Sequence, residues 1–154
     1  MRGNRVVKCS ATDLDAFTTP NYPPLAEMSV DINIHGANIL QSAGDTSEFT
    51  VQDKLSKNVV MLRLFPSITT ETVKSFFQPP AEAVILQTYG AGNVPTNRLD
   101  LLEIFKKANE EQGIIIVNIT QCWSGSVQAL YATGAVLAKY GVISGYVSPY
   151  SLMT

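Results

Sequence analysis

Histidine and cysteine are scarce in this sequence, and their scarcity excludes most metal and disulfide chemistry. The 154 residues include one histidine, His35, and two cysteines, Cys9 and Cys122, which lie far apart and form no CxxC pair. A disulfide framework or a structural zinc site needs more such residues at closer spacing. We therefore expect two free thiols in a reducing compartment and no metal site.

Long apolar runs and an excess of charge of one sign are also missing. The longest uninterrupted aliphatic stretch runs from Ile114 to Val117, and no apolar signal region follows Met1, so no membrane span is predicted. Eleven basic and thirteen acidic residues give a formal charge of −2, which excludes an electrostatic footprint for nucleic acid. We expect a cytoplasmic protein that binds neither membrane nor nucleic acid.

The sequence does have enough hydrophobic residues for a core, 45% of the total, and they follow a repeating pattern. Apolar runs at 59–65, 84–88 and 114–119 predict strands, helical patterns follow them, and Val142 begins a fourth strand. Such units predict a parallel sheet with right-handed crossovers and flanking helices. The fold class is therefore α/β, a Rossmann-like domain without the GxGxxG or GxxxxGK[ST] motifs for nucleotide phosphate.

The helical pattern after the second strand is the most regular one. Asn97 is its expected cap and Gly113 its expected end. One side of the pattern is apolar and predicts a buried stripe, formed by Leu101, Leu102, Phe105 and Ala108.

Residues 1–35 do not show the pattern of an independent domain. The run from Thr18 to Pro24 cannot be helical, and Val30, Ile32 and Ile34 alternate with polar residues, which predicts a half-buried strand. The segment has too few apolar positions for a core of its own. We expect it to pack against another part of a protein.

A glycine-bearing loop after the second strand is the main candidate for a site. The strand Val84-Ile85-Leu86 is apolar on both faces, and the loop Tyr89-Gly90-Ala91-Gly92-Asn93 follows it closely. Parallel sheets place ligands at the carboxyl ends of their strands. Gly90 and Gly92 allow a close backbone approach, and Asn93 offers two donors and an acceptor for an amide or carboxylate.

A second loop, from Asn118 to Cys122, ends the third strand and is expected beside the first if the two strands are neighbours. For Cys122, a catalytic nucleophile and a packed thiol are the alternatives. No histidine lies near it in the sequence, which favours the packed thiol.

These two loops carry a family resemblance. TYGAGN at 88–93, followed by NITQCWSG at 118–125, resembles the C-terminal domain of type I, cytoplasmic-type L-asparaginases. The resemblance implies the end of an N-terminal domain plus a connector over 1–57 and the C-terminal domain over 58–146. Residues 147–154 form a tail that departs from the family, which continues there with an amphipathic helix.

The resemblance also implies roles for individual residues. Lys8 matches the lysine of a threonine–lysine–aspartate group that activates a nucleophile, whereas from composition alone it would be a solvated strand lysine. Asn93 matches an asparagine that extends across a dimer interface into the partner's active site, where it contacts substrate. Thr120 and Cys122 match a second asparagine site that regulates bacterial members, so they would be a remnant of that site here.

Several departures from the family bear on activity. Bacterial members have a threonine in place of Val7 and an arginine in place of Gln87, so bacterial-style regulation is not expected. The nucleophilic threonine of the family lies in a TGGT-type motif and its partner residues in TDT or GTDT, and this sequence contains neither motif. The family converts L-asparagine to L-aspartate and ammonia without a cofactor, and we expect this chain to be inactive alone.

The implied partners are L-asparagine, in the intact enzyme, and either copies of the chain in a homo-oligomer or a full-length asparaginase subunit. Two other hypotheses remain. One is a non-catalytic partner that modifies full-length subunits, which co-purification with an intact asparaginase would reveal. The other is an unrelated small-molecule binder, which the missing phosphate motifs disfavour.

Overall fold

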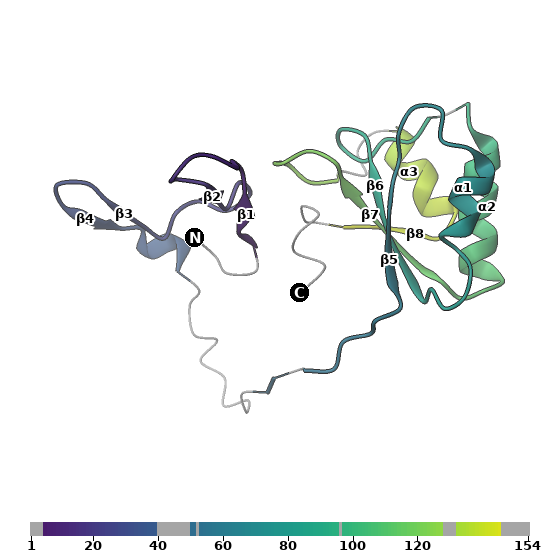
Figure 1. Cartoon of the computed structure of the whole chain (residues 1–154), viewed down its shortest axis with the longest axis horizontal. Helices are drawn as coiled ribbons and strands as arrows, with labels where there is room; N and C mark the ends of the chain where they lie inside the picture. The colour runs from purple at the N-terminus through teal and green to yellow at the C-terminus, as the bar shows by residue number, and fades with distance from the viewer. Residues whose placement is uncertain (1–4, 40–49, 52, 96, 128–131, 146–154) are drawn as a thin grey trace. The chain divides into compact units, whose positions relative to one another are not determined.

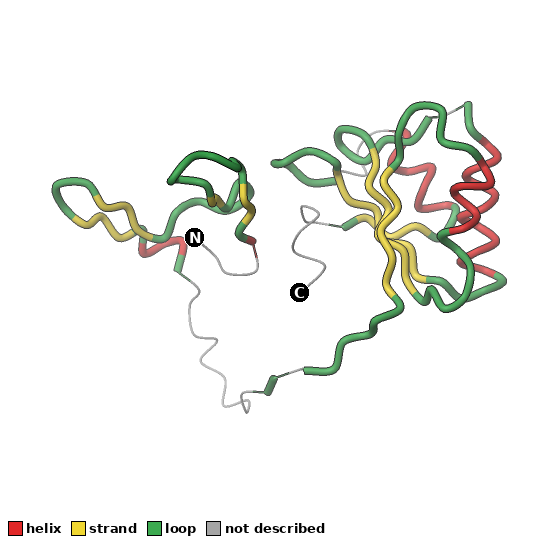
Figure 2. Tube along the Cα trace, viewed as in Figure 1, coloured by secondary structure: helices red, strands yellow, loops and turns green. Residues whose placement is uncertain are grey.

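The computed structural model describes residues 5–39, 50–51, 53–95, 97–127 and 132–145. The chain divides into two compact units, Met1–Ser56 and Lys57–Thr154. Figure 1 gives the order of the elements along the chain, and Figure 2 distinguishes helices, strands and loops. The predicted tail, 147–154, lies outside the described residues.

The first unit contains two short antiparallel strand pairs. Strands β1 (Val7–Lys8) and β2 (Phe17–Thr18) pair with each other, as do β3 (Ala26–Met28) and β4 (Ile32–Ile34), and a single turn of 3-10 helix, η2 (Gly36–Asn38), follows. Among the described residues of this unit, the buried side chains are Val7, Ala16 and Thr19. The described part of this unit therefore has almost no hydrophobic core.

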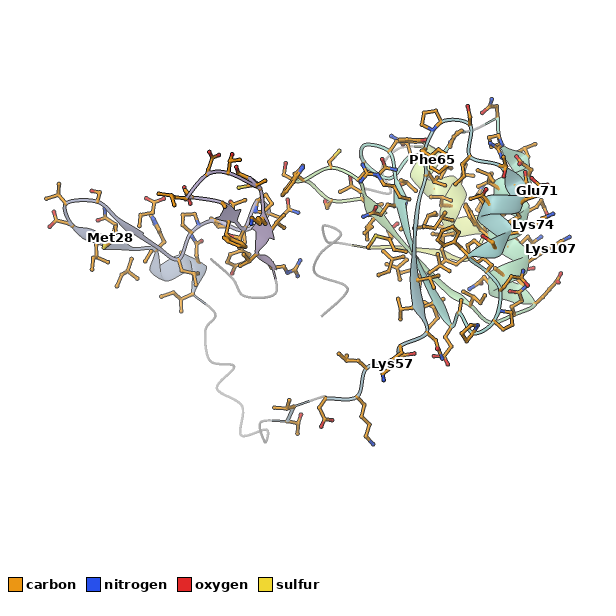
Figure 3. The ribbon with its side chains drawn as sticks, viewed as in Figure 1. Met28, Lys57, Phe65, Glu71, Lys74 and Lys107 are labelled. Atoms are coloured by element: carbon orange, nitrogen blue, oxygen red, sulfur yellow. The ribbon has the colours of Figure 1, made fainter. Side chains whose placement is uncertain are left out.

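The β3–β4 hairpin is more exposed than the sequence predicts. Ile32 and Ile34 do lie on a strand, but their side chains are 67% and 68% exposed, and Met28, opposite Ile32, is 83% exposed (Figure 3). The expected half-burial is wrong for the chain as described, because no second layer covers the hairpin within the described part of its unit. Alternation indicates a strand, whereas burial depends on what packs against it.

The second unit is built on a parallel sheet of four strands. These are β5 (Val59–Arg63), β6 (Ala83–Thr88), β7 (Ile115–Thr120) and β8 (Val142–Ser144), in the order β5-β6-β7-β8. The connecting helices are α1 (Thr70–Ser75), α2 (Leu99–Glu110) and α3 (Ala132–Lys139). The predicted α/β class is confirmed.

All three helices lie on the same face of this sheet (Figure 1). Each crossover advances by one strand in the same direction, and crossovers of one hand then place every helix on one side. On the opposite face, Val59, Ile115 and Ile143 are exposed, while Ile85 is buried. The helices predicted to flank the sheet are therefore confined, among the described residues, to one of its faces.

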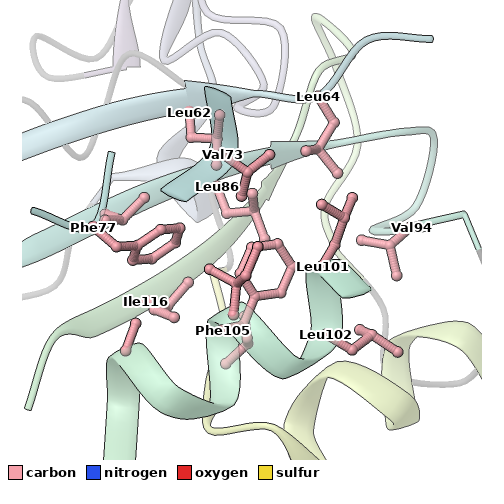
Figure 4. Packing of buried hydrophobic residues seen from close by; sticks show 14 of the residues in the cluster. Leu62, Leu64, Val73, Phe77, Leu86, Val94, Leu101, Leu102, Phe105 and Ile116 are labelled. Carbon is pink, nitrogen blue, oxygen red and sulfur yellow. The ribbon is translucent and has the colours of Figure 1, made fainter. Parts of the chain in front are cut away.

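The core lies between the sheet and the helices (Figure 4). Leu86 of β6 and Ile116 of β7 face Phe105 of α2, whose ring centroid is 5.8 Å from that of Phe77. Helix α2 supplies the largest share of the buried helical side chains: Leu101, Leu102, Ile104, Phe105 and Ala108. The stripe predicted for this helix is confirmed, and Lys107 lies on its exposed side (Figure 3).

The start of α2 differs from the predicted one. Its N-cap position is Arg98 and not Asn97. The Arg98 guanidinium donates from Nη2 to Asp100 at 2.7 Å and from Nη1 to the carbonyl of Ile68 at 3.0 Å, and Thr70 Oγ1 donates to Asp100 at 2.6 Å. The hydrogen bonds from Arg98 and then Thr70 hold the pKa of the Asp100 carboxyl well below its usual value.

Two leucines of α2 test this description of the core. Leu102 is 3% exposed and Leu99 is 64% exposed. We expect Leu102→Ala to lower the free energy of unfolding by about 2–5 kcal/mol, because it leaves a cavity, and Leu99→Ala to change it by less than about 0.5 kcal/mol. Urea denaturation of both variants measures the difference, and equal effects would mean that α2 packs through another face.

Candidate functional site

The loop after β6 is closed at its base by the backbone. Tyr89 N–H donates to the carbonyl of Asn93 at 3.0 Å, and Asn93 N–H donates back to the carbonyl of Tyr89 at 2.7 Å. Between them, Gly90 and Gly92 have φ angles of 49° and 109°, a region that favours glycine. Asn93, the predicted substrate-contacting residue, therefore ends a tight loop at the carboxyl end of the sheet.

Gly92 is also confined by its neighbours. A Cβ atom at this position would lie 2.6 Å from Val127 Cγ1 and 3.1 Å from Asn118 Nδ2. The first distance is shorter than packed atoms tolerate and the second is tight, so a side chain here would displace Val127 or the loop. Packing against the protein itself therefore favours glycine at position 92, in addition to the ligand approach that the sequence suggested.

The second predicted loop does lie beside the first, since β6 and β7 are neighbours and Thr88 pairs in register with Thr120. Thr120 Oγ1 donates to the carbonyl of Gly90 at 2.6 Å, and Asn118 Nδ2 donates to the carbonyl of Gly92 at 3.2 Å. The structure thus brings Asn93 and Thr120 together in one site region.

Gln121 joins the carboxyl ends of two strands. Its Nε2 donates to the carbonyl of Leu64 at 2.6 Å and to that of Gln87 at 3.0 Å, and its backbone N–H donates to the carbonyl of Thr88 at 3.0 Å. Sequence reasoning assigned no role to Gln121 or to Asn118. An amide side chain at the end of an otherwise apolar strand was the available signal.

The environment of Cys122 differs from the predicted one. Its side chain is exposed, as are those of Trp123 and Ser124, so the expected packed thiol is wrong. The Cys122 N–H donates to Thr120 Oγ1 at 3.0 Å. Cys122 lies where β7 gives way to an irregular loop, and irregular loops rarely bury their side chains.

Lys8 belongs to the first unit, whereas Asn93, Thr120 and Cys122 belong to the second. It lies on β1, opposite Phe17, and its side chain is exposed with Nζ 5.7 Å from the centroid of the Phe17 ring. The described residues of the first unit therefore leave the Lys8 side chain exposed to solvent.

An apolar hollow of about 230 Å³ lies beside the site loop, lined by residues that include Leu64, Phe65, Ile68 and Tyr89. Its charged member, Arg98, already donates to Asp100 and to the carbonyl of Ile68. The lining offers little that would recognise the charged groups of an amino acid.

Metal-binding clusters and membrane-spanning helices are both absent from the described residues. No three histidine, cysteine, aspartate or glutamate side chains are grouped closely enough there to hold a metal ion. Nor does any helix in those ranges combine the length and apolar character that crossing a bilayer requires.

The fold and the candidate site define a class: an α/β domain with a parallel sheet and a closed, glycine-bearing loop at the carboxyl edge of that sheet. The family model described as Glutaminase/Asparaginase C-terminal domain matches residues 58–150. The chain belongs to the glutaminase/asparaginase family, and its relatives include type I enzymes.

Three similar proteins illustrate the relationship. The chain is 45% identical over 144 residues to L-asparaginase of Dirofilaria immitis and 41% identical over 145 residues to 60 kDa lysophospholipase of Mus musculus, with 94% of the chain covered in both. The crystal structure of L-asparaginase I from Vibrio cholerae superposes with a TM-score of 0.86 at 36% identity, over 99% of this chain and 45% of the other. The chain spans 24% and 25% of the two curated relatives.

A comparison of Gly113 with Gly92 distinguishes the effect of a positive φ angle from the effect of tight packing. Gly113 has a φ of 69° but open space where a methyl group would lie, whereas Gly92 combines a positive φ with the contacts to Val127 and Asn118. We expect Gly113→Ala to lower the free energy of unfolding by about 1–2 kcal/mol and Gly92→Ala by a further 1–3 kcal/mol or so. Urea denaturation measures both, and a Gly92→Ala variant no less stable than Gly113→Ala would refute the tight packing of the loop.

Proposed function

We propose that this chain supplies part of an active site that hydrolyses L-asparagine to L-aspartate and ammonia. The observation that carries the proposal is the closed Tyr89–Asn93 loop, which presents Asn93 at the carboxyl edge of the sheet in a chain of the glutaminase/asparaginase family. Hydrogen bonds across its base and to β7 restrict the conformation of this loop.

Asn93 is the proposed substrate contact. An amide side chain donates through its nitrogen and accepts through its oxygen, so it matches the carboxylate, ammonium and amide groups of asparagine. A group held on a closed loop loses little conformational freedom when the substrate binds, which favours binding and correct orientation. We propose that Asn93 acts on a site in a second polypeptide, as the family resemblance implies.

Lys8 is the proposed proton acceptor. Taking a proton from a threonine hydroxyl requires a neutral amine, and removal of water from around a lysine favours the neutral form. Because Lys8 is exposed on β1, that removal of water has to come from protein that packs over β1 and β2.

The reaction itself would proceed in two steps. A threonine oxygen attacks the carbon of the side-chain amide, the C–N bond breaks, and ammonia leaves with the proton that the lysine took up. Water then adds to the resulting ester, and the C–O bond breaks to release aspartate. No threonine motif for the first step occurs in these 154 residues, so we propose that the nucleophile comes from protein outside them.

Asn93 can be tested in trans. The tagged 154-residue chain is co-expressed with full-length L-asparaginase of Dirofilaria immitis in which the asparagine aligned with Asn93 is replaced by alanine. We expect no ammonia from L-asparagine with the chain alone, and about tenfold more from the co-purified pair than from the altered relative alone, since the missing hydrogen bonds are restored. Asn93→Ala in the chain should abolish the gain, whereas Asn97→Ala, an exposed asparagine of the same connection, should preserve it.

Three results would count against this reading. Ammonia from the chain alone would show that no second polypeptide is required. A co-purified pair without restored activity would refute the role of Asn93. A pair less active than the altered relative by itself would identify the chain as a non-catalytic modulator of full-length subunits.

Lys8 is tested in a chimera in which the N-terminal segment of the Dirofilaria immitis enzyme precedes Arg2. We expect the chimera to release ammonia from L-asparagine and Lys8→Arg to lower kcat by about 10²–10⁴-fold, because a guanidinium does not give up its proton. Lys74→Arg, on the exposed side of α1, should leave kcat within about twofold. A Lys8→Arg chimera of parental activity would remove Lys8 from the mechanism.

A further inference from the structure

Two side chains of β7 reach the backbone of the site loop at two successive points. Thr120 Oγ1 donates to the carbonyl of Gly90 at 2.6 Å, and Asn118 Nδ2 donates to the carbonyl of Gly92 at 3.2 Å. Both residues are 1% exposed. A buried polar side chain keeps its hydrogen-bond partners, because an unpaired one is costly.

Neighbouring groups fix the direction of both hydrogen bonds. Thr88 Oγ1 donates to Asn118 Oδ1 at 2.6 Å, which leaves the Asn118 Nδ2 facing the loop. The Cys122 N–H donates to Thr120 Oγ1 at 3.0 Å, which leaves the Thr120 hydroxyl proton for Gly90. Each donor is therefore oriented by a second hydrogen bond.

The contacted carbonyls belong to the two residues of the loop with the greatest backbone freedom. Gly90 and Gly92 both have positive φ angles, and glycine explores alternative conformations more readily than other residues. Hydrogen bonds to both carbonyls restrict the loop on either side of Ala91. Asn93 follows Gly92 directly, so its position depends on the conformation of that glycine.

We propose that Thr120 and Asn118 are positioning residues, which hold the Gly90 and Gly92 carbonyls and thereby set where Asn93 meets the substrate. The effect on substrate rests on the proposed function, whereas the effect on the loop does not. The Thr120 hydroxyl is already engaged on two sides, by Gly90 and by Cys122. A regulatory ligand that required this hydroxyl would have to displace the loop contact.

The first experiment measures the loop in the 154-residue chain. Thr120→Val removes the hydroxyl at nearly constant shape, and Thr120→Ser retains it. We expect the amide hydrogens of Gly92 and Asn93, both bonded to the Tyr89 carbonyl, to exchange about three- to tenfold faster in Thr120→Val. Thr120→Ser should remain within about twofold of the parent, and so should the Phe105 amide in α2 of either variant.

The second experiment measures substrate recognition in the pair formed with the altered Dirofilaria immitis enzyme. A displaced Asn93 weakens a contact made to bound substrate, so we expect Thr120→Val to raise KM for L-asparagine about tenfold with kcat within about twofold. Thr120→Ser should restore the parental KM. A loss of folded protein would instead lower the apparent kcat at constant KM, so this readout separates positioning from stability.

Each outcome decides one part of the proposal. Unchanged exchange in Thr120→Val would show that the hydroxyl does not hold the loop. Faster exchange with unchanged KM, in a pair where Asn93→Ala does abolish the restored activity, would show that the held conformation does not serve substrate. If Asn93→Ala has no effect, the proposed function fails, and the exchange experiment still determines whether Thr120 holds the loop.

Discussion

The carbonyl groups at the carboxyl end of a parallel sheet need hydrogen-bond donors once the strands have ended, and the site of this protein depends on how that need is met. The carbonyls of Leu64 and Gln87 receive the Gln121 side chain, and those of Gly90 and Gly92 receive Thr120 and Asn118. One short segment, from Asn118 to Gln121, thus supplies donors to the residue after β5, to β6 and to the loop after β6. A loop supported in this way can hold a ligand contact without being part of the sheet.

The same segment explains which parts of the site the sequence could predict. The Tyr89–Asn93 loop could be found because its glycines follow an apolar strand, and both signals are local. Its support could not, because the partner of Gly90 lies 30 residues away and that of Gly92 lies 26 away. The contacts of Thr120 and Asn118 with the loop can be predicted only once β7 is known to be the neighbour of β6.

A similar division holds for the fold. The buried stripe of α2 follows from helical periodicity, which its own residues determine. The start of α2 lies one residue later than predicted. Arg98, its N-cap residue, contacts Asp100 within the helix and Ile68, which lies between β5 and α1 and is 30 residues away in the sequence. Burial of the β3–β4 hairpin and of Cys122 was wrongly predicted for the same general reason. Alternation and residue type are local properties, whereas burial depends on the layers that surround a segment.

The two residues for which we propose roles belong to different units, and this division has a chemical consequence. Lys8 is on a strand pair with almost no core, and Asn93 is on a loop braced by a packed sheet. A hydrogen-bonding contact works wherever its loop is rigid, so Asn93 needs nothing beyond its own unit to be positioned. The role proposed for Lys8 needs removal of water as well as position, and the described residues of the first unit leave its side chain exposed. The two proposed roles, recognition by Asn93 and proton transfer by Lys8, therefore make different demands on assembly, and the described structure supports the position of Asn93 more fully than that of Lys8.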